Sequence, residues 1–445
     1  MKKLIELLIE NSVYIIFAGL TIFVYLGTRK RNQNHKEAVK LVEKAIQSKM
    51  NEPITLHPEI DPAICVGCGA CTKVCPEGDI LKLIDHKAVL VGPTKCLGHG
   101  ECERACPVNA IKLVFGTKTR GMDIPRLSTN YETNVPGLYI AGELGGMGLI
   151  RNAIKQGTLA GTDALSKLSA DKTDYDIIVV GAGPAGLAAS ITAISKKKSY
   201  LCIEQGSLGG TVFNFPRQKI VMSYPFEFPI VGKKKFESNK VSKEQLLEYW
   251  NEVRTKTGLK IQEQTKFENI EKTGDIFSVK TNNGNYSAKK VVLSMGVRGS
   301  PRKLGVPGEE SAKVTYNLLD PEQYQNNRIV VVGGGNAGVE AAQMLSEARW
   351  NNKVHLLVRT DTFDRCNEDN IRRITAMQKK GLVEIWYNSS IVEIFDTKII
   401  VKKNDEVITL ANNFVFVFAG AELPHKFLMS LGVQIDKKYA EGLGS

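Results

Sequence analysis

Two apolar segments of the chain each run into a glycine-rich turn and continue into an alanine-rich stretch. They cover residues 175–190 and 328–342. A G-x-G-x-x-G turn between a buried strand and a helix brings the backbone close to a dinucleotide pyrophosphate, which lies at the helix N-terminus. The turn glycines are Gly181, Gly183 and Gly186 in the first segment, and Gly333, Gly335 and Gly338 in the second. The sequence therefore predicts two Rossmann-like dinucleotide-binding domains.

The residue that ends the following strand differs between the two segments. Residues 200–204 end in Glu204, a carboxylate that suits both hydroxyls of an unphosphorylated adenosine ribose, as in FAD or NAD. Residues 353–359 end in Arg359, a guanidinium that favours a 2′-phosphate. We expect FAD in the first fold and NADPH in the second, with Arg365 as a second clamp and Asn336 in the turn. An exposed strand end without a binding role is the alternative for Arg359, and NADH stays an option.

Seven of the nine cysteines fall between Cys65 and Cys106. Residues 65–76 read C-x2-C-x2-C-x3-C-P, the bacterial iron-sulfur run in which three thiolates hold one cluster and the fourth holds another. Residues 96–107 repeat this run with His99 in the place of the second cysteine. Zinc is the alternative, but zinc sites use isolated C-x-x-C pairs.

Residues 55–114 resemble a two-cluster bacterial ferredoxin. The crossed ligation of that family implies a 4Fe-4S cluster held by Cys65, Cys68, Cys71 and Cys106. The second cluster would be held by Cys75, Cys96 and Cys102, together with or beside His99. Two alternatives stay open there: a 3Fe-4S cluster with an unligated imidazole, or a 4Fe-4S cluster with histidine as a ligand.

The two nucleotide folds, joined through residues 291–309, resemble the thioredoxin reductase family of flavoproteins over residues 115–440. In that family a strand and a helix near the C-terminus close the flavin site with a Gly-Asp pair. Here the matching stretch, residues 133–157, precedes both folds and carries Gly142 and Glu143. The resemblance implies a circular permutation in which Glu143 bonds the ribityl chain and the helix N-terminus near Ala153 faces the flavin. An unrelated apolar strand and helix is the alternative.

Residues 209–216 resemble the flavin-contacting loop of the same family and of bacillithiol disulfide reductases, which implies flavin contacts at Gly210 and Thr211. Thioredoxin reductases carry a redox C-x-x-C pair in the NADPH domain, and none occurs in residues 296–445. A dithiol relay is therefore not expected. Cys202 lies between apolar neighbours and is expected in the core, while Cys366 is expected to be an incidental thiol.

An uncharged, mostly apolar run lies between Glu10 and Arg29. As a helix it would just span a bilayer, and basic residues follow it at once. The excess of positive charge after the run predicts a single-pass protein of the cytoplasmic membrane, with its N-terminus outside and its body in the cytoplasm. A cleaved secretory signal and a buried soluble helix are the alternatives.

These features divide the 445 residues into six segments. They are a transmembrane anchor (1–31), a tether (32–54), a dicluster ferredoxin-like domain (55–114), the permuted closing segment of the FAD domain (115–170), the FAD-binding domain (171–300) and the NAD(P)H-binding domain (301–445). The predicted fold class is α/β with two Rossmann-like domains, a small α+β ferredoxin domain and one transmembrane helix. A composition of 43% hydrophobic and 24% charged residues excludes a multi-span membrane protein.

The motifs together predict a membrane-anchored NAD(P)H-dependent flavoprotein oxidoreductase. Electrons would move between NADPH, FAD and two iron-sulfur clusters, to or from a protein or membrane partner. One alternative is a disulfide or small-thiol reductase with an accessory ferredoxin domain, and another is a non-catalytic redox-sensing or tethering subunit. The net charge of +12 is not accompanied by a nucleic-acid motif, so no nucleic-acid partner is expected. Homodimer formation stays open.

Overall fold

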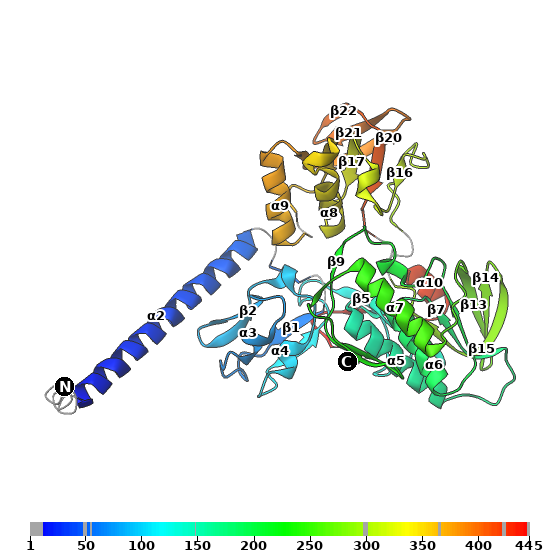
Figure 1. The fold of residues 1–445 in the computed structure, drawn as a ribbon, viewed down its shortest axis with the longest axis horizontal. Helices are drawn as coiled ribbons and strands as arrows, with labels where there is room; N and C mark the ends of the chain where they lie inside the picture. The colour runs from blue at the N-terminus through cyan, green and yellow to red at the C-terminus, as the bar shows by residue number, and fades with distance from the viewer. Residues whose placement is uncertain are drawn as a thin grey trace. The chain divides into compact units, whose positions relative to one another are not determined.

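The computed structural model describes residues 12–47, 51–53, 56–146, 148–296, 301–363, 366–420 and 424–442 (Figure 1). The chain divides into two compact units. The first consists of Met1–Pro53 with His57–Leu113, and the second consists of Ile54–Leu56 with Val114–Ser445. Each unit has a hydrophobic core of its own.

Helix α2 (Ser12–Gln47) opens the described part of the first unit (Figure 1). It continues through residue 31, where the sequence predicted a boundary between an anchor and a tether. Its second half packs on the antiparallel hairpin of β2 (Leu81–Ile84) and β3 (Lys87–Leu90), and Ala38 is fully buried there. At the hairpin turn, the guanidinium of Arg31 contacts the imidazole of His86.

No helix among the described residues is long and apolar enough to cross a membrane. The hydrocarbon core of a bilayer needs about 20 consecutive, mostly apolar residues. Helix α2 is described from Ser12 onward, includes polar Thr21 and Thr28, and becomes basic at Arg29. The predicted membrane localisation, with its single-pass arrangement, is therefore wrong. Residues 1–11 of the predicted anchor lie outside the described residues.

The cysteine-rich part of the first unit has an internal repeat. Strand β1 (His57–Ile60) pairs with β4 (Ile111–Val114), and η1 (Pro93–Lys95) precedes the second cysteine run. Each run enters a short helix, α3 (Ala70–Val74) or α4 (Glu101–Arg104). Both helices follow a glycine in the left-handed region, Gly69 at φ 73° and Gly100 at φ 77°, where a β-carbon would cost energy.

In the second unit, the first Rossmann fold is built on a parallel sheet. Half of β15 (Gly284–Leu293) lies between β6 (Leu138–Ile140) and β7 (Tyr175–Val180), and β8 (Tyr200–Ile203) pairs with β7. The other half of β15 pairs antiparallel with β14 (Ile276–Thr281), which pairs with β13 (Phe267–Thr273). Strand β6 therefore joins this sheet although it precedes β7 in the chain.

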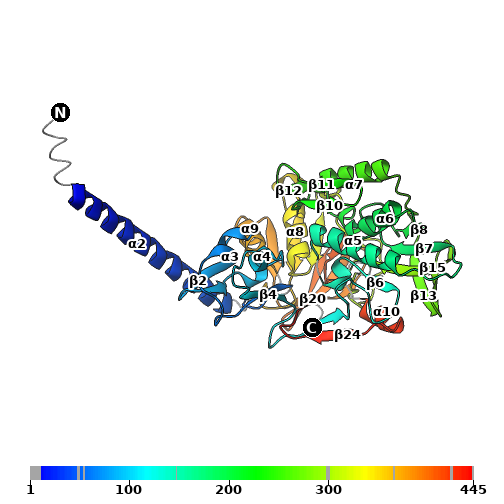
Figure 2. The ribbon, with the colours of Figure 1, turned by 90° about the horizontal axis from the view of Figure 1, so that it is seen from below.

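Helices pack closely around this sheet. Helices α5 (Ile150–Ser166) and α6 (Pro184–Ser195) lie side by side (Figure 2). A β-carbon on Gly157 would lie 2.0 Å from the carbonyl oxygen of Ala185, so only glycine allows this approach. Helix α7 (Lys243–Thr257) begins with a capping box between Ser242 and Gln245 and buries Trp250 in the same core as α6.

Short elements complete the first fold. They are η2 (Glu143–Gly145), η3 (Gly210–Val212), the pair β9 (Ile220–Met222) with β12 (Lys240–Ser242), and the pair β10 (Phe226–Phe228) with β11 (Gly232–Lys234).

The second Rossmann fold has a parallel sheet in the order β16-β23-β17-β18-β19. These strands are Val314–Thr315, Phe414–Val417, Arg328–Val332, Lys353–Leu357 and Val383–Trp386. Its helices are α8 (Asn336–Leu345) and α9 (Glu368–Lys379), with short turns η4 (Pro321–Gln323) and η5 (Ala348–Trp350). An antiparallel meander follows, formed by β20 (Ser389–Ile394), β21 (Lys398–Lys403) and β22 (Glu406–Ala411).

The last described segment returns to the first Rossmann fold. After α10 (His425–Ser430), β24 (Ile435–Lys438) pairs antiparallel with β5 (Met122–Pro125). The guanidinium of Arg126 donates two hydrogen bonds to Asp436, at 2.9 and 2.7 Å. The two ends of this unit are thus neighbours in one antiparallel pair.

Candidate functional site

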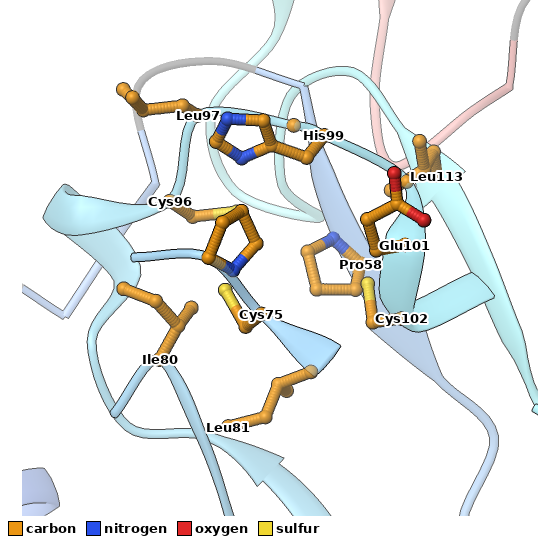
Figure 3. Close-up of a pocket in the computed structure, with 13 residues that line it drawn as sticks. Pro58, Cys75, Ile80, Leu81, Cys96, Leu97, His99, Glu101, Cys102 and Leu113 are labelled. Atoms are coloured by element: carbon orange, nitrogen blue, oxygen red, sulfur yellow. The ribbon is translucent and has the colours of Figure 1, made fainter. Parts of the chain in front are cut away.

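The cysteines of the first unit gather around two cavities. One cavity is lined by the thiols of Cys65, Cys68, Cys71 and Cys106, and the other is lined by those of Cys75, Cys96 and Cys102 together with His99. Figure 3 shows the second cavity, with the three thiols directed at its centre and the imidazole beside them. The last cysteine of each run, Cys75 or Cys106, lies with the other run, which is the crossed grouping that the resemblance to ferredoxins implies.

Burial disfavours the free thiolate form of four of these cysteines, Cys71, Cys75, Cys96 and Cys102. Burial, together with neighbouring Cys65 and Cys68, raises the pKa of Cys71. Burial and the neighbouring Cys96 thiolate raise the pKa of Cys102 to about 12, and burial raises the pKa of Cys96 to about 11. Iron supplies the positive charge that keeps such buried sulfurs ionised. The donor set therefore fits iron-sulfur clusters.

The backbone around the first cavity also fits a cluster. Gly67 has φ 69°, and a β-carbon there would lie 2.0 Å from the carbonyl oxygen of His86. Amides point at sulfur: the N–H of Ala88 donates to Cys65 Sγ at 3.5 Å, and that of Ala110 donates to Cys106 Sγ at 3.2 Å. Hydrogen bonds of this kind stabilise cluster sulfurs and tune the reduction potential.

His99 has a neighbour that the sequence motifs did not reveal. Its Nε2 lies 3.6 Å from Oε1 of Glu77, and the imidazole is almost fully buried. Glu77 follows the Cys-Pro end of the first run, so only the folded arrangement of the two runs brings it to this histidine. A carboxylate beside a ring nitrogen orients an imidazole and raises its basicity.

In the first Rossmann fold, the carboxylate of Glu204 lies at the glycine turn. The N–H of Ala182 donates to its Oε2 at 2.8 Å, and the N–H of Gly206 donates to its Oε1 at 3.0 Å. Both carboxylate oxygens keep further acceptor capacity for ribose hydroxyls. The backbone therefore fixes the carboxylate at the carboxyl edge of the sheet, where adenosine binds in this fold.

The glycine turn has the space and the close packing that a pyrophosphate site requires. A β-carbon on Gly186 would lie 1.8 Å from the carbonyl oxygen of Gly181, whereas one on Gly183 would meet nothing within 4 Å. Gly210 approaches this open side, with its β-carbon position 3.6 Å from Gly183 Cα, and Thr211 lies beside Gly296. The predicted residues of the turn and of the loop at residues 209–216 thus come together.

The segment after β6 lies beside the first turn of α6. The β-carbon position of Gly142 lies 3.2 Å from Cβ of Ala185 and 4.0 Å from Cβ of Ala153. Glu143 begins the turn η2 and packs against Gly148. The N–H of Gly142 donates to Oε1 of Gln156 at 2.7 Å, a contact that the sequence motifs did not predict.

The second Rossmann fold repeats the tight turn. A β-carbon on Gly338 would lie 2.2 Å from the carbonyl oxygen of Gly333. Gly335 is the N-cap of α8, and Asn336 Oδ1 accepts from the N–H of Asn367 at 2.9 Å, which ties the loop before α9 to the turn. Arg359 is exposed just after β18, while Arg365 lies outside the described residues. The nucleotide contacts of Asn336 and Arg359 stay predictions.

The two cysteines outside the ferredoxin-like region are buried. Cys202 and Cys366 are each 1% exposed and pack in the cores of the first and the second Rossmann fold. Burial raises the pKa of each of these thiols to about 12. Neither is an accessible thiolate, and the sequence holds no other cysteine beyond residue 106.

The fold and the sites together define a flavin-dependent NAD(P)H oxidoreductase that carries an iron-sulfur domain. Residues 178–442 match the family described as pyridine nucleotide-disulphide oxidoreductase, and residues 57–107 match the 4Fe-4S dicluster domain. The chain belongs to the pyridine nucleotide-disulphide oxidoreductase family. Its Rossmann folds are of the type found in thioredoxin reductases and ferredoxin-NADP reductases, and it is an enzyme.

Individual relatives agree with this assignment. The chain is 30% identical to a ferredoxin-NADP reductase of Ignicoccus hospitalis, over 59% of this chain and 83% of that protein. It is 27% identical to bacilliredoxin reductase of Bacillus subtilis, over 59% and 81%. Among solved structures, bacillithiol disulfide reductase from Bacillus cereus matches with a TM-score of 0.53 and 29% identity, over 59% of this chain and 82% of that one.

Proposed function

We propose that this enzyme exchanges electrons between NADPH and a one-electron partner protein through a bound FAD and the two clusters of its ferredoxin-like domain. Flavin accepts two electrons from nicotinamide and releases them singly, and iron-sulfur clusters carry one electron each. The observation that carries the proposal is that one cavity lined by four cysteines and another lined by three cysteines and His99 occur in the same chain as a flavoprotein fold that has no accessible thiol of its own.

The surface at the first cavity supports exchange with a partner. Cys68 is exposed, and the side chain of Val66 beside it is 64% exposed. A cluster held there would lie near the surface, where a partner protein can approach closely. Such a partner fits the ferredoxin-NADP reductases among the relatives, which are named for the protein ferredoxin.

For the second cavity we propose a 4Fe-4S cluster with His99 as its fourth ligand. The support is Glu77, which lies beside Nε2 and so favours Nδ1 as the ligating nitrogen. An imidazole in place of a thiolate makes the site less negative and raises its reduction potential. The two clusters would then differ in potential within one small domain.

The order of elements supports a circular permutation of the flavoprotein. Strand β6 and helix α5 complete the first Rossmann fold although they precede it in the chain. Phe115 and Glu441 face each other, with the N–H of Phe115 donating to the carbonyl oxygen of Glu441 at 2.9 Å. Strands β5 and β24 thus have the arrangement of a β-hairpin whose turn is open, and the ferredoxin-like domain is attached at that turn.

A disulfide or small-thiol reductase is the second candidate, because bacilliredoxin reductase is among the relatives. A substrate disulfide would have to meet the flavin directly, since Cys202 and Cys366 are buried and apart in different cores. This candidate leaves the two cysteine cavities without a role, so electron exchange through the clusters is preferred.

Anaerobic stopped-flow absorbance with cluster-replete protein and NADPH tests the proposal, with EPR on samples frozen at matching times. Flavin bleaching followed by cluster reduction is the expected result. If the clusters stay oxidised after NADPH and also fail to reduce the flavin after chemical reduction, the electron route is wrong. Turnover of a small disulfide under the same conditions would then favour the second candidate.

A further inference from the structure

One short segment of the first Rossmann fold contacts the second fold. It follows directly on the predicted flavin-contacting loop and contains Arg217 and Lys219. The N–H of Arg217 donates to the carbonyl oxygen of Leu319 at 2.8 Å, and its guanidinium lies 3.4 Å from the carboxylate of Asp320. Lys219 Nζ donates to Oε2 of Glu340 on α8 at 2.9 Å. A main-chain hydrogen bond and two ion pairs thus join this segment to the second fold.

The segment also has a fixed place in the first fold. The N–H of Lys243 donates to the carbonyl oxygen of Lys219 at 2.9 Å, and Lys243 Nζ donates to that of Phe215 at 2.6 Å. The N–H of Gln218 donates to Oε1 of Glu244 at 3.1 Å. Lys243 and Glu244 begin α7, so the segment is bound to the body of the first fold where it meets the second.

From Glu340, hydrogen bonds lead to the second glycine turn. Asn370, which is 7% exposed, donates from Nδ2 to Glu340 Oε1 at 2.9 Å and to Asn336 Oδ1 at 3.2 Å. Asn336 follows Gly335, the N-cap of α8, where a dinucleotide pyrophosphate binds in this fold. The flavin-contacting loop and the nucleotide turn therefore lie at the two ends of one continuous set of contacts.

The lysine in this set of contacts is held in place. The side chains of Lys219 and Glu340 are 24% and 29% exposed, so solvent screens their ion pair less than an exposed pair. Lys219 Nζ also lies 4.8 Å from the centroid of the Phe215 ring, a second favourable contact for its charge.

We propose that Lys219 is a positioning residue for flavin reduction. Through its ion pair with Glu340 it holds the nucleotide turn of the second fold in the place from which the nicotinamide reaches the flavin. The step is the transfer of a hydride, two electrons with one proton, from NADPH, which becomes NADP⁺, to FAD, which becomes reduced. The reacting atoms must approach to about 3–3.5 Å, so a small shift between the folds slows the transfer. This inference rests on the proposed electron transfer from NADPH to FAD.

The first test is amide hydrogen exchange of the full-length protein, measured by mass spectrometry, for Lys219→Met. The N–H of Arg217 bonds to a carbonyl of the other fold, so its exchange reports on the link between the folds. Peptides that contain Arg217 should exchange at least about threefold faster than in the parent, while peptides from β7 and β17 should be unchanged. Lys235→Met is the matched control, because Lys235 is an exposed lysine of the same fold.

The second test is the rate constant of flavin reduction, measured by anaerobic stopped-flow absorbance at saturating NADPH. Lys219→Met should lower it at least about tenfold, with the Kd for FAD within about twofold of the parent. Lys219→Arg keeps the positive charge and should stay within about threefold of the parent. Lys235→Met should reduce its flavin as the parent does.

Three results would each overturn the proposal. They are unchanged exchange at Arg217, flavin reduction in Lys219→Met within about twofold of the parent, and a Lys219→Arg variant as slow as Lys219→Met. Glu340→Gln is the second variant should Lys219→Met fail to fold, because it keeps an acceptor for Asn370 without the charge, and the same thresholds apply to it. A parent reduced by NADPH no faster than Lys219→Met refutes this inference alone, whereas a parent that NADPH does not reduce refutes the proposed function.

Discussion

His99 Nε2 lies 3.6 Å from the carboxylate oxygen Oε1 of Glu77, at the rim of a cavity that three cysteine thiols also line. The pair consists of a ring nitrogen and an orienting carboxylate, the arrangement that often holds a ligating histidine in place. Its two members come from different cysteine runs, so it exists only in the folded domain.

If His99 ligates iron, His99→Ala should convert the second cluster from four irons to three. EPR of the oxidised variant should then show a 3Fe-4S signal that the parent lacks. His99→Cys should keep four irons and lower the reduction potential, on the order of 100 mV, because a thiolate adds negative charge. Glu101→Gln, in the same cavity lining, is the control. A 3Fe-4S signal already present in the freshly prepared parent would contradict His99 ligation.

The sequence was sufficient for features whose chemistry is local. The glycine turns and the cysteine runs each fit within about a dozen residues, and the structure brings their members together. The contacts of Glu77 and Gln156 were not predicted, because each residue contacts a partner from another element of the fold. The pairing of β24 with β5 could not be predicted from local patterns either, because it joins opposite ends of the second unit. The predicted membrane localisation was wrong. The apolar run alone does not show that its helix continues to Gln47 and packs on the β2–β3 hairpin.

The second prediction concerns the choice of nucleotide. Arg359 is exposed at the end of β18, where a guanidinium can pair with a 2′-phosphate. Arg359→Glu should lower kcat/KM for NADPH roughly 30- to 150-fold, which corresponds to a loss of about 2–3 kcal/mol in transition-state stabilisation. The kcat/KM for NADH should change less than about threefold. Arg372→Glu, on the exposed side of α9, is the control for net charge. Equal losses with both nucleotides would remove Arg359 from the 2′-phosphate site.

A third prediction follows from Glu309, in the segment that leads into the second Rossmann fold. Its carboxylate accepts from the N–H groups of Leu304 at 2.5 Å and Gly305 at 2.7 Å, and from the hydroxyl of Tyr316 at 2.6 Å. Burial opposes ionisation, but these hydrogen bonds outweigh it and lower the pKa of Glu309. The stabilisation is therefore present above the ordinary glutamate pKa and is lost as the pH falls through the lowered value.

Glu309→Gln should destabilise this segment at pH 7 by about 1–3 kcal/mol. The difference in Tm between parent and variant should narrow between about pH 5 and pH 3, where the parent carboxylate becomes protonated. Glu310→Gln is the matched control, because its side chain is 88% exposed and its ion pair with Lys303, at 3.4 Å, is open to solvent. A Tm difference that stays constant over this pH range would show that ionisation of Glu309 does not matter.

The last prediction tests the permutation through chain order. Glu441 and Phe115 face each other at the open end of the β24–β5 pair, so a turn of about two to four residues could join them. A rearranged chain of residues 171–442, such a turn and residues 115–170 should fold and bind FAD without the ferredoxin-like domain. NADPH should bleach its flavin, while reduction of a one-electron partner should be lost. The matched control has the same residues in their natural order, 115–442. Flavin binding by the control but not by the rearranged chain would refute the permutation. If the chain is a circular permutation, both orders of the segments should form the same core and bind the flavin.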